Sequence, residues 1–168
     1  MKNRKGETVA KTAAFFSIAL AWVLLDQLSK SHFAGMQPGG VLAGPFAGIF
    51  DIRLVHNTGG AWGIFSNSTF GLGVFSLIVC AALTVFFLVT IKEMNRLHVV
   101  AFALIVAGGV GNAIDRFTQG YVTDFIEFSF IDFPVFNVAD IGVTCGFALL
   151  IVGMLVFARS ADDREDVR

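Results

Sequence analysis

The chain has 168 residues, of which 55% are hydrophobic and 15% are charged, and its mean hydropathy is +0.75. The length suits one domain, and the apolar excess indicates a membrane protein rather than a soluble one. A net charge of −1 provides no basic surface for nucleic acid, and the two cysteines form no CxxC pair that would indicate redox chemistry or a zinc ribbon.

Four apolar stretches approach the length of about 20 residues that a helix needs to cross a bilayer. They predict spans at about 12–28, 69–91, 97–114 and 136–158 within a single integral membrane domain covering 1–168. The first stretch follows several basic residues, as in a signal peptide, but it is long and ends in DQLSK rather than in small residues. We therefore expect it to be retained as a span.

The basic residues are distributed unevenly between the segments that connect these spans. Nine of the twelve Lys and Arg residues lie in the N-terminal segment, the 92–96 turn or the C-terminal tail, against three in the other connections. Because positive charge favours the cytoplasmic side, both termini are predicted to be cytoplasmic. The longer loops, near 31–67 and 115–135, then face outward.

The outer loops carry strand-like patterns. Phe50, Ile52 and Leu54 alternate with more polar neighbours, which is the period of a half-buried strand, and AWGIF after Gly59 and Gly60 is predicted to return as a second strand. The aromatic segment 121–136 is either a further strand pair or an interfacial segment. The expected fold is a mainly α membrane protein with four transmembrane helices and an outer β-cradle at about 41–65 with 121–135. Trp62 is either a membrane anchor or part of a substrate groove.

Polar residues gather at or near the outer ends of the predicted spans. Taken singly, each has an ordinary explanation: Asn137 can cap the fourth helix with Asp140 completing a capping box, for example. Together they predict a site at the edge of the membrane, where charge is costly. They are Asp26, Asn57, Asn112, Asp115, Arg116, Asp124, Asn137 and Asp140.

Asp124 and Asp140 are separated by a short loop, so their carboxyl groups can come close together. Two carboxylates that share a site cannot both ionise easily, so one keeps a proton. Such a pair can act as general base toward water and as general acid toward a carbonyl oxygen or an amine. No GxSxG, Cys–His pairing or HExxH supplies a nucleophile or a zinc site.

Two other functions are compatible with these acidic residues. One is a metal-dependent hydrolase that uses Asp115, Asp124 and Asp140, and sensitivity to chelators would identify it. The other is a small transporter or proton relay, for which acids deep within the spans are expected, whereas here they gather at one end. An intramembrane protease built around GxGD is less consistent with this chain, which has GVGN.

The segment GGVGNAIDR closes the third span. Its Gly108 and Gly109 favour close helix packing, which is common in membranes, and the segment is not a dinucleotide fingerprint because no strand precedes it. Asn112 and Arg116 lie one helical turn apart on one face. They can hold a substrate carbonyl or the carboxylate pair.

The chain resembles the bacterial lipoprotein signal peptidases, or signal peptidase II, a family of membrane aspartyl peptidases. The resemblance covers nearly the whole chain and departs at no motif position. Five blocks carry it in order: DQLSK at 26–30, HNTGGAWGIF at 56–65, GGVGNAIDR at 108–116, YVTDF at 121–125 and FPVFNVAD at 133–140.

This resemblance implies an enzyme of the bacterial inner membrane with its active site at the outer face. It implies removal of the signal peptide from prolipoproteins by cleavage before a lipid-modified cysteine, with no cofactor or metal. Prolipoproteins and membrane lipids are the expected partners, and a monomer is expected. By position, Asp124 and Asp140 are the catalytic pair. The resemblance gives supporting or substrate-binding roles to Asp26, Asn57, Trp62, Gly108, Asn112, Arg116 and Asn137.

Overall fold

The computed structural model describes the backbone of residues 2–59 and 68–165 and the side chains of residues 4–59 and 68–155. Its helices are α1 (Lys2–Ser31), α2 (Thr69–Thr90), α3 (Arg96–Thr118) and α4 (Val138–Glu165). Within the described residues, four helices are long and apolar enough to cross a membrane. The predicted combination of four membrane helices with a small sheet is therefore confirmed.

Helix α3 lies at the centre of the bundle and packs against α1, α2 and α4. Its residues from Ala101 to Gly108 are all buried, whereas the other three helices expose many large apolar side chains. These exposed apolar side chains are compatible with a lipid environment, because lipid tails are as apolar as the side chains and their contact carries no hydrophobic penalty. Within the bundle, the rings of Phe15 and Phe87 stack at 4.4 Å between α1 and α2.

Small residues let α3 approach its neighbours. A methyl group added at Gly108 would collide with the backbone carbonyl of Ala139 and the side chain of Val143 on α4, and one added at Gly109 would collide with Cys80 Sγ on α2. Both glycines therefore serve close packing, as the small-residue pattern predicts.

The sheet has three antiparallel strands in the order β1 (Val41–Phe46), β2 (Phe50–Asn57) and β3 (Val122–Phe128). Strand β2 contains the predicted alternating segment, and its Leu54 packs with Phe33 and Phe125 in a second apolar cluster. Its hairpin partner is β1, which precedes it. The predicted return strand AWGIF and Trp62 lie outside the described residues.

The aromatic segment after Tyr121 forms one strand rather than a strand pair. Beyond β3 the chain turns back, and Phe136 makes an isolated bridge to Ile126. The backbone N–H of Phe136 donates to Ile126 (2.9 Å), and its carbonyl accepts from Phe125 (3.0 Å) and Ile126 (2.8 Å). This bridge covers the free edge of β3 and places the start of α4 beside the sheet.

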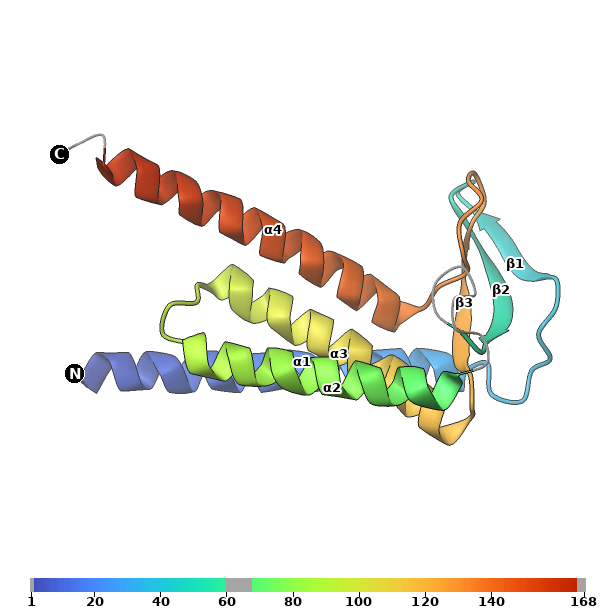
Figure 1. Cartoon of the computed structure of the whole chain (residues 1–168). Coiled ribbons are helices and arrows are strands. Elements are labelled where there is room, and N and C mark those ends of the chain that lie inside the picture. Colours follow the sequence, from blue (N-terminus) through green and yellow to red (C-terminus); the bar gives the residue numbers. More distant parts are fainter. Residues whose placement is uncertain (1, 60–67, 166–168) are drawn as a thin grey trace.

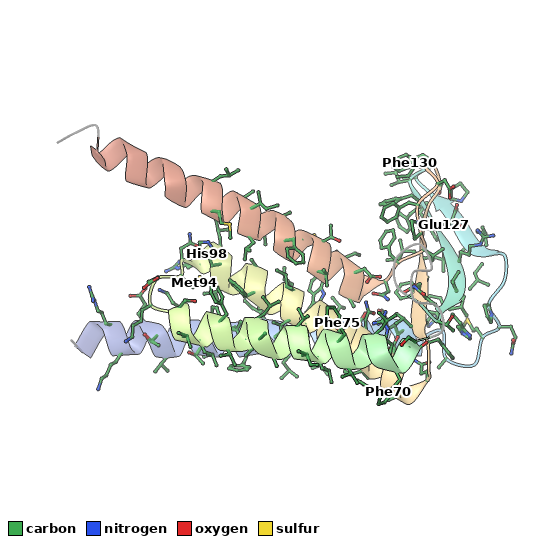
Figure 2. The ribbon with its side chains drawn as sticks, viewed as in Figure 1. Phe70, Phe75, Met94, His98, Glu127 and Phe130 are labelled. Carbon is green, nitrogen blue, oxygen red and sulfur yellow. The ribbon has the colours of Figure 1, made fainter. Side chains whose placement is uncertain are left out.

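The sheet and the chain ends lie at opposite ends of the helices (Figure 1). The start of α1, the α2–α3 turn and the end of α4 share the end away from the sheet. Met94 and His98 lie there, whereas Glu127 in β3 and Phe130 just beyond it lie at the sheet end (Figure 2). Four crossings thus return the chain to its starting side and present the sheet on the other.

The contact at Gly108 gives a prediction about stability. Gly108→Ala should destabilise the fold by about 1–3 kcal/mol, the usual cost of overpacking, because the added methyl meets the backbone of α4. Thermal unfolding in detergent measures the loss. Gly6→Ala is the matched control, since Gly6 is also helical and a methyl there meets nothing within 4 Å. Equal melting temperatures for the two variants would contradict this packing role.

Candidate active site

Asp124 lies in β3 and its side chain is buried, with 1% of its surface exposed. Both carboxyl oxygens accept hydrogen bonds from amide groups: Oδ2 from Asn57 Nδ2 (2.9 Å) and Oδ1 from Asn137 Nδ2 (2.6 Å). The donors come from β2 and from the residue before α4. The carboxyl group is thus fixed where the sheet meets the bundle.

An irregularity in β2 places Asn57 beside Asp124. Ile52 pairs with Ile126, but Val55 rather than Leu54 pairs with Asp124, so β2 contains one extra residue between these pairs. A shift of one residue exchanges the two faces of a strand. As a result, Val55 and Asn57 line the same pocket as Asp124, while Leu54 turns into the apolar cluster.

Asp140 lies in the first turn of α4 and forms the predicted capping box with Asn137. The backbone N–H of Asn137 donates to Asp140 Oδ2 (3.1 Å), and the backbone N–H of Asp140 donates to Asn137 Oδ1 (3.0 Å). Asn112 Nδ2 on α3 donates to the other oxygen, Oδ1, at 2.8 Å. Asp140 therefore stabilises the start of its helix and also faces the pocket.

Asn137 connects the two carboxyl groups, because it bonds to Asp124 through its side chain and to Asp140 through its backbone. Burial, and secondarily the negative charge of Asp140, raise the pKa of Asp124 to about 7, although Asn57, Asn137 and the charge of Lys30 oppose the shift. A carboxyl group with this pKa is protonated in a large fraction of molecules at neutral pH. The pair can thus supply an acid and a base together.

Both carboxyl groups line one pocket of about 580 Å³. Its polar end also contains Asn57, Asn112 and Arg116. The rest of the lining is mostly apolar and follows α4 and the β3–α4 loop: Phe128, Phe133, Pro134, Val135, Phe136, Ile141, Val143, Thr144 and Cys145. The pocket therefore combines a reactive polar end with an apolar wall.

Arg116 lines this pocket one turn beyond Asn112. Its Nη1 donates to the Asn112 carbonyl (3.4 Å) and its Nη2 to the Gly59 carbonyl (3.2 Å). In the part of the chain that the structure describes, its Nε is buried and has no hydrogen-bond partner. A buried N–H group without an acceptor is uncommon in folded proteins.

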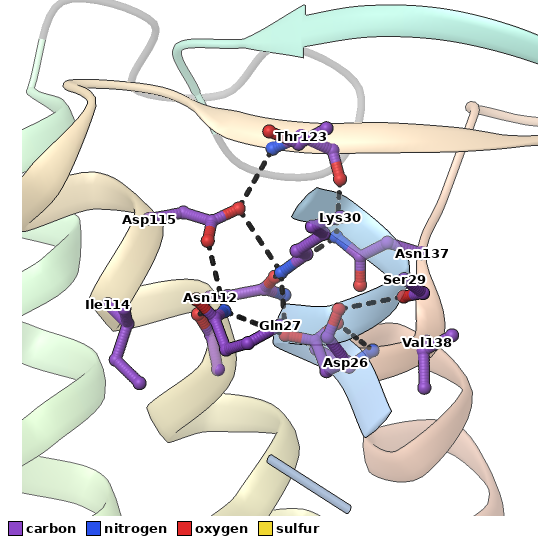
Figure 3. A network of polar contacts seen from close by, with 12 residues as sticks. Asp26, Gln27, Ser29, Lys30, Asn112, Ile114, Asp115, Thr123, Asn137 and Val138 are labelled. Carbon is purple, nitrogen blue, oxygen red and sulfur yellow. Dashed lines mark hydrogen bonds and ion pairs between the residues drawn. The ribbon is translucent and has the colours of Figure 1, made fainter. Parts of the chain in front are cut away.

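A second cluster of polar contacts is centred on Lys30 (Figure 3), and Asn112 connects it to Asp140. Lys30 Nζ is 2.9 Å from Asp26 Oδ2 and 3.2 Å from Asp115 Oδ2. Asp26 also accepts from the Ala139 N–H of α4 (2.9 Å), and Asp115 accepts from the Thr123 N–H of β3 (3.0 Å). Asp26 thus supports the site from outside the pocket by holding α1 to the start of α4.

Lys30 and Gln27 were not among the residues that the sequence singled out for the site. Gln27 Nε2 donates to Asp26, Asp115 and the Gly111 carbonyl. The signal for Lys30 was its spacing of four residues from Asp26, which puts both on one helix face.

Asp26 and Asn137 contact the site without lining the pocket, and three other predicted residues either lie away from it or are outside the described residues. Asp115 points toward Lys30 rather than toward Asp124 and Asp140, and no group of three potential metal ligands forms among the described side chains. Gly108 packs against α4 and does not line the pocket. Trp62 is outside the described residues.

Comparison with known proteins gives this arrangement its family. The family model that describes signal peptidase (SPase) II matches residues 18–156 of this chain. The chain belongs to the signal peptidase II family. It is 42% identical over 158 residues to the lipoprotein signal peptidase of Dehalococcoides mccartyi, covering 90% of this chain and 95% of that protein. It is 37% identical over 145 residues to that of Synechocystis sp., covering 86% and 89%.

The fold agrees with this membership. A solved bacterial membrane enzyme superposes with a TM-score of 0.77 at 34% identity, covering 85% of this chain and 88% of the other. The resemblance predicted from the five sequence blocks is therefore confirmed, and so is a membrane aspartic peptidase as the class of enzyme.

The surroundings of Asp124 give a prediction about its ionisation. Asn57→Leu should raise the pKa of Asp124 above its value of about 7, because Asn57 donates to the carboxylate and lowers the pKa. An infrared pH titration of the protonated carboxyl band follows this group directly. Asp124→Asn identifies the band by removing it. An unchanged or lowered midpoint in Asn57→Leu would contradict the assignment.

Proposed function

We propose that this membrane peptidase removes the signal peptide from prolipoproteins by cleaving before a lipid-modified cysteine, with Asp124 and Asp140 as the catalytic pair. The observation that carries the proposal is the pair itself: two carboxyl groups, connected by Asn137, at the polar end of an otherwise apolar pocket. An apolar wall suits a substrate that carries both acyl chains and a hydrophobic signal helix.

The proposed reaction begins with water between the two carboxyl groups. Asp140 takes a proton from the water as its oxygen adds to the scissile carbonyl carbon, and Asp124 gives its proton to the carbonyl oxygen. The resulting tetrahedral diol collapses as Asp140 passes its proton to the leaving amine of cysteine. One hydroxyl proton returns to Asp124, so the pair ends as it began.

The raised pKa of Asp124 supports its assignment as the acid. The guanidinium group of Arg116, a residue that lines the same pocket, supports a role in binding a substrate carbonyl. Asn112 and Asn137 orient the carboxyl groups through the hydrogen bonds described above. In this mechanism the protein uses no cofactor or metal and acts as a monomer.

Replacing either catalytic carboxyl group should stop turnover. Asp124→Asn and Asp140→Asn should each lower the processing rate by about 10²–10⁴-fold or more, the usual contribution of a positioned acid or base. A gel-shift assay of a diacylglyceryl-modified prolipoprotein measures this. Asp132→Asn is the matched control, because Asp132 is exposed in the same outer loop and does not line the pocket.

Substantial turnover by Asp124→Asn or by Asp140→Asn would refute the assignment of the catalytic pair. Activity that disappears with a chelator and returns with a divalent metal would instead favour the metal-dependent hydrolase. Asp140→Asn should also lower the melting temperature, since Asp140 caps α4. Asp124→Asn should leave the melting temperature closer to that of the wild type.

We further propose that both termini face the cytoplasm of a bacterial inner membrane and that the pocket opens at its outer face. The arrangement in Figure 1 supports a shared side for the termini, and the uneven distribution of Lys and Arg supports the orientation.

Labelling of single cysteines tests this orientation in a background with Cys80 and Cys145 replaced. Gly39→Cys in the outer loop should react with a membrane-impermeant maleimide in intact spheroplasts. Lys92→Cys in the α2–α3 turn should react only after permeabilisation. The reverse pattern would invert the proposed topology.

A further inference from the structure

The ammonium group of Lys30 is almost completely buried, with 4% of the residue exposed. A buried charge is stable only when it is paired and hydrogen-bonded. Lys30 Nζ lies 2.9 Å from Asp26 Oδ2, 3.2 Å from Asp115 Oδ2 and 2.9 Å from Asn112 Oδ1. An ammonium has three N–H donors and no acceptor, so these three contacts use all of its donors.

The third contact is one of those that fix which way the Asn112 side chain points, and it is the one made by a charged donor. Asn112 Oδ1 accepts from Lys30 and also from Asn137 Nδ2 (3.0 Å), while Asn112 Nδ2 donates to Asp140 Oδ1 (2.8 Å). A flipped amide would place its NH₂ group against the donors of Lys30 and Asn137. It would also turn its oxygen toward the carboxylate of Asp140, where no donor would remain.

The direction of the Asn112 amide matters because few other contacts constrain the carboxyl group of Asp140. Its Oδ2 is held by the Asn137 backbone N–H, but its Oδ1 has Asn112 as its donor in the described part of the chain. A correctly oriented Asn112 therefore fixes the plane of the Asp140 carboxyl group relative to Asp124.

We propose that Lys30 is a positioning residue for peptide hydrolysis, which acts through the Asn112 side-chain amide on Asp140 without touching the substrate. This inference rests on the proposed catalytic pair. Lys30 does not line the pocket, and its hydrogen-bonded route to Asp140 is the side chain of Asn112.

A double-mutant cycle separates this role from a merely structural one. Lys30→Met should lower kcat by about 10²-fold, the scale on which misplaced groups slow catalysis, with little change in KM. Asn112→Ala should have a similar effect. Because both changes remove the same orienting contact, the double variant should be hardly slower than either single variant.

The assay uses the full-length enzyme in detergent with a diacylglyceryl-modified prolipoprotein. Losses that multiply to about 10⁴-fold in the double variant would overturn the proposal, as would a Lys30→Met enzyme that changes only KM. If wild-type enzyme does not cleave this substrate, the proposed function itself fails. If it does cleave and the losses multiply, only the role of Lys30 fails.

Gln27→Met is the matched control, because Gln27 bonds to Asp26 and Asp115 but not to Asn112. It should lower the melting temperature and leave kcat near that of wild type. A Gln27→Met enzyme as slow as Lys30→Met would show that any damage to this cluster slows the reaction, which would overturn the proposal.

Lys30→Met leaves two buried carboxylates without their cation and can therefore prevent folding. The second variant, Lys30→Met with Asp115→Asn, restores the net charge of the cluster. It should fold and still show the reduced kcat, because Asn112 Oδ1 again lacks its ammonium donor. Recovery of wild-type kcat in this variant would overturn the proposal.

Discussion

The buried ion pairs of Lys30 with Asp26 and Asp115 are the contacts on which the sheet end of the molecule depends. An isolated charge in this setting would be costly, and removing one partner of a buried pair typically costs about 3–5 kcal/mol. Each carboxylate also accepts a backbone hydrogen bond, Asp26 from the N–H of Ala139 and Asp115 from the N–H of Thr123. Through these contacts, one ammonium group connects α1 with α3, β3 and α4.

The carboxyl groups that we propose as catalytic lie on the elements that this cluster contacts. Asp124 follows Thr123 in β3, and Asp140 follows Ala139 in α4, so each lies one residue beyond a backbone N–H that the cluster holds. The buried ion pairs that order these elements are made by Lys30, Asp26 and Asp115, not by the two carboxyl groups themselves. The pKa of Asp124 is still raised, because burial and the negative charge of Asp140 outweigh the opposing charge of Lys30.

Much of the molecule could be predicted from the sequence where the physical signal is local. Apolar length identified the four helices, and the spacing of Asn137 and Asp140 identified the capping box. The pairing of β2 with β1 was not predicted, because the strand period does not show which neighbouring segment completes a hairpin. Lys30 was missed because its importance comes from Asn112 and Asp115, more than 80 residues away in sequence. The extra residue in β2 could not be predicted either, because the alternation of apolar and polar residues does not show where a strand shifts its register.

Asn137, which connects the two carboxyl groups, immediately precedes α4, the last helix in the described part of the chain. Without Asn137 and α4, Asp124 lacks one of its two amide donors and Asp140 is absent from the pocket. A chain without α4 therefore lacks the proposed proton-transfer pair, even with its other three helices folded. The first turn of the last helix completes the pocket, so the proposed chemistry depends on the whole bundle rather than on any three of its helices.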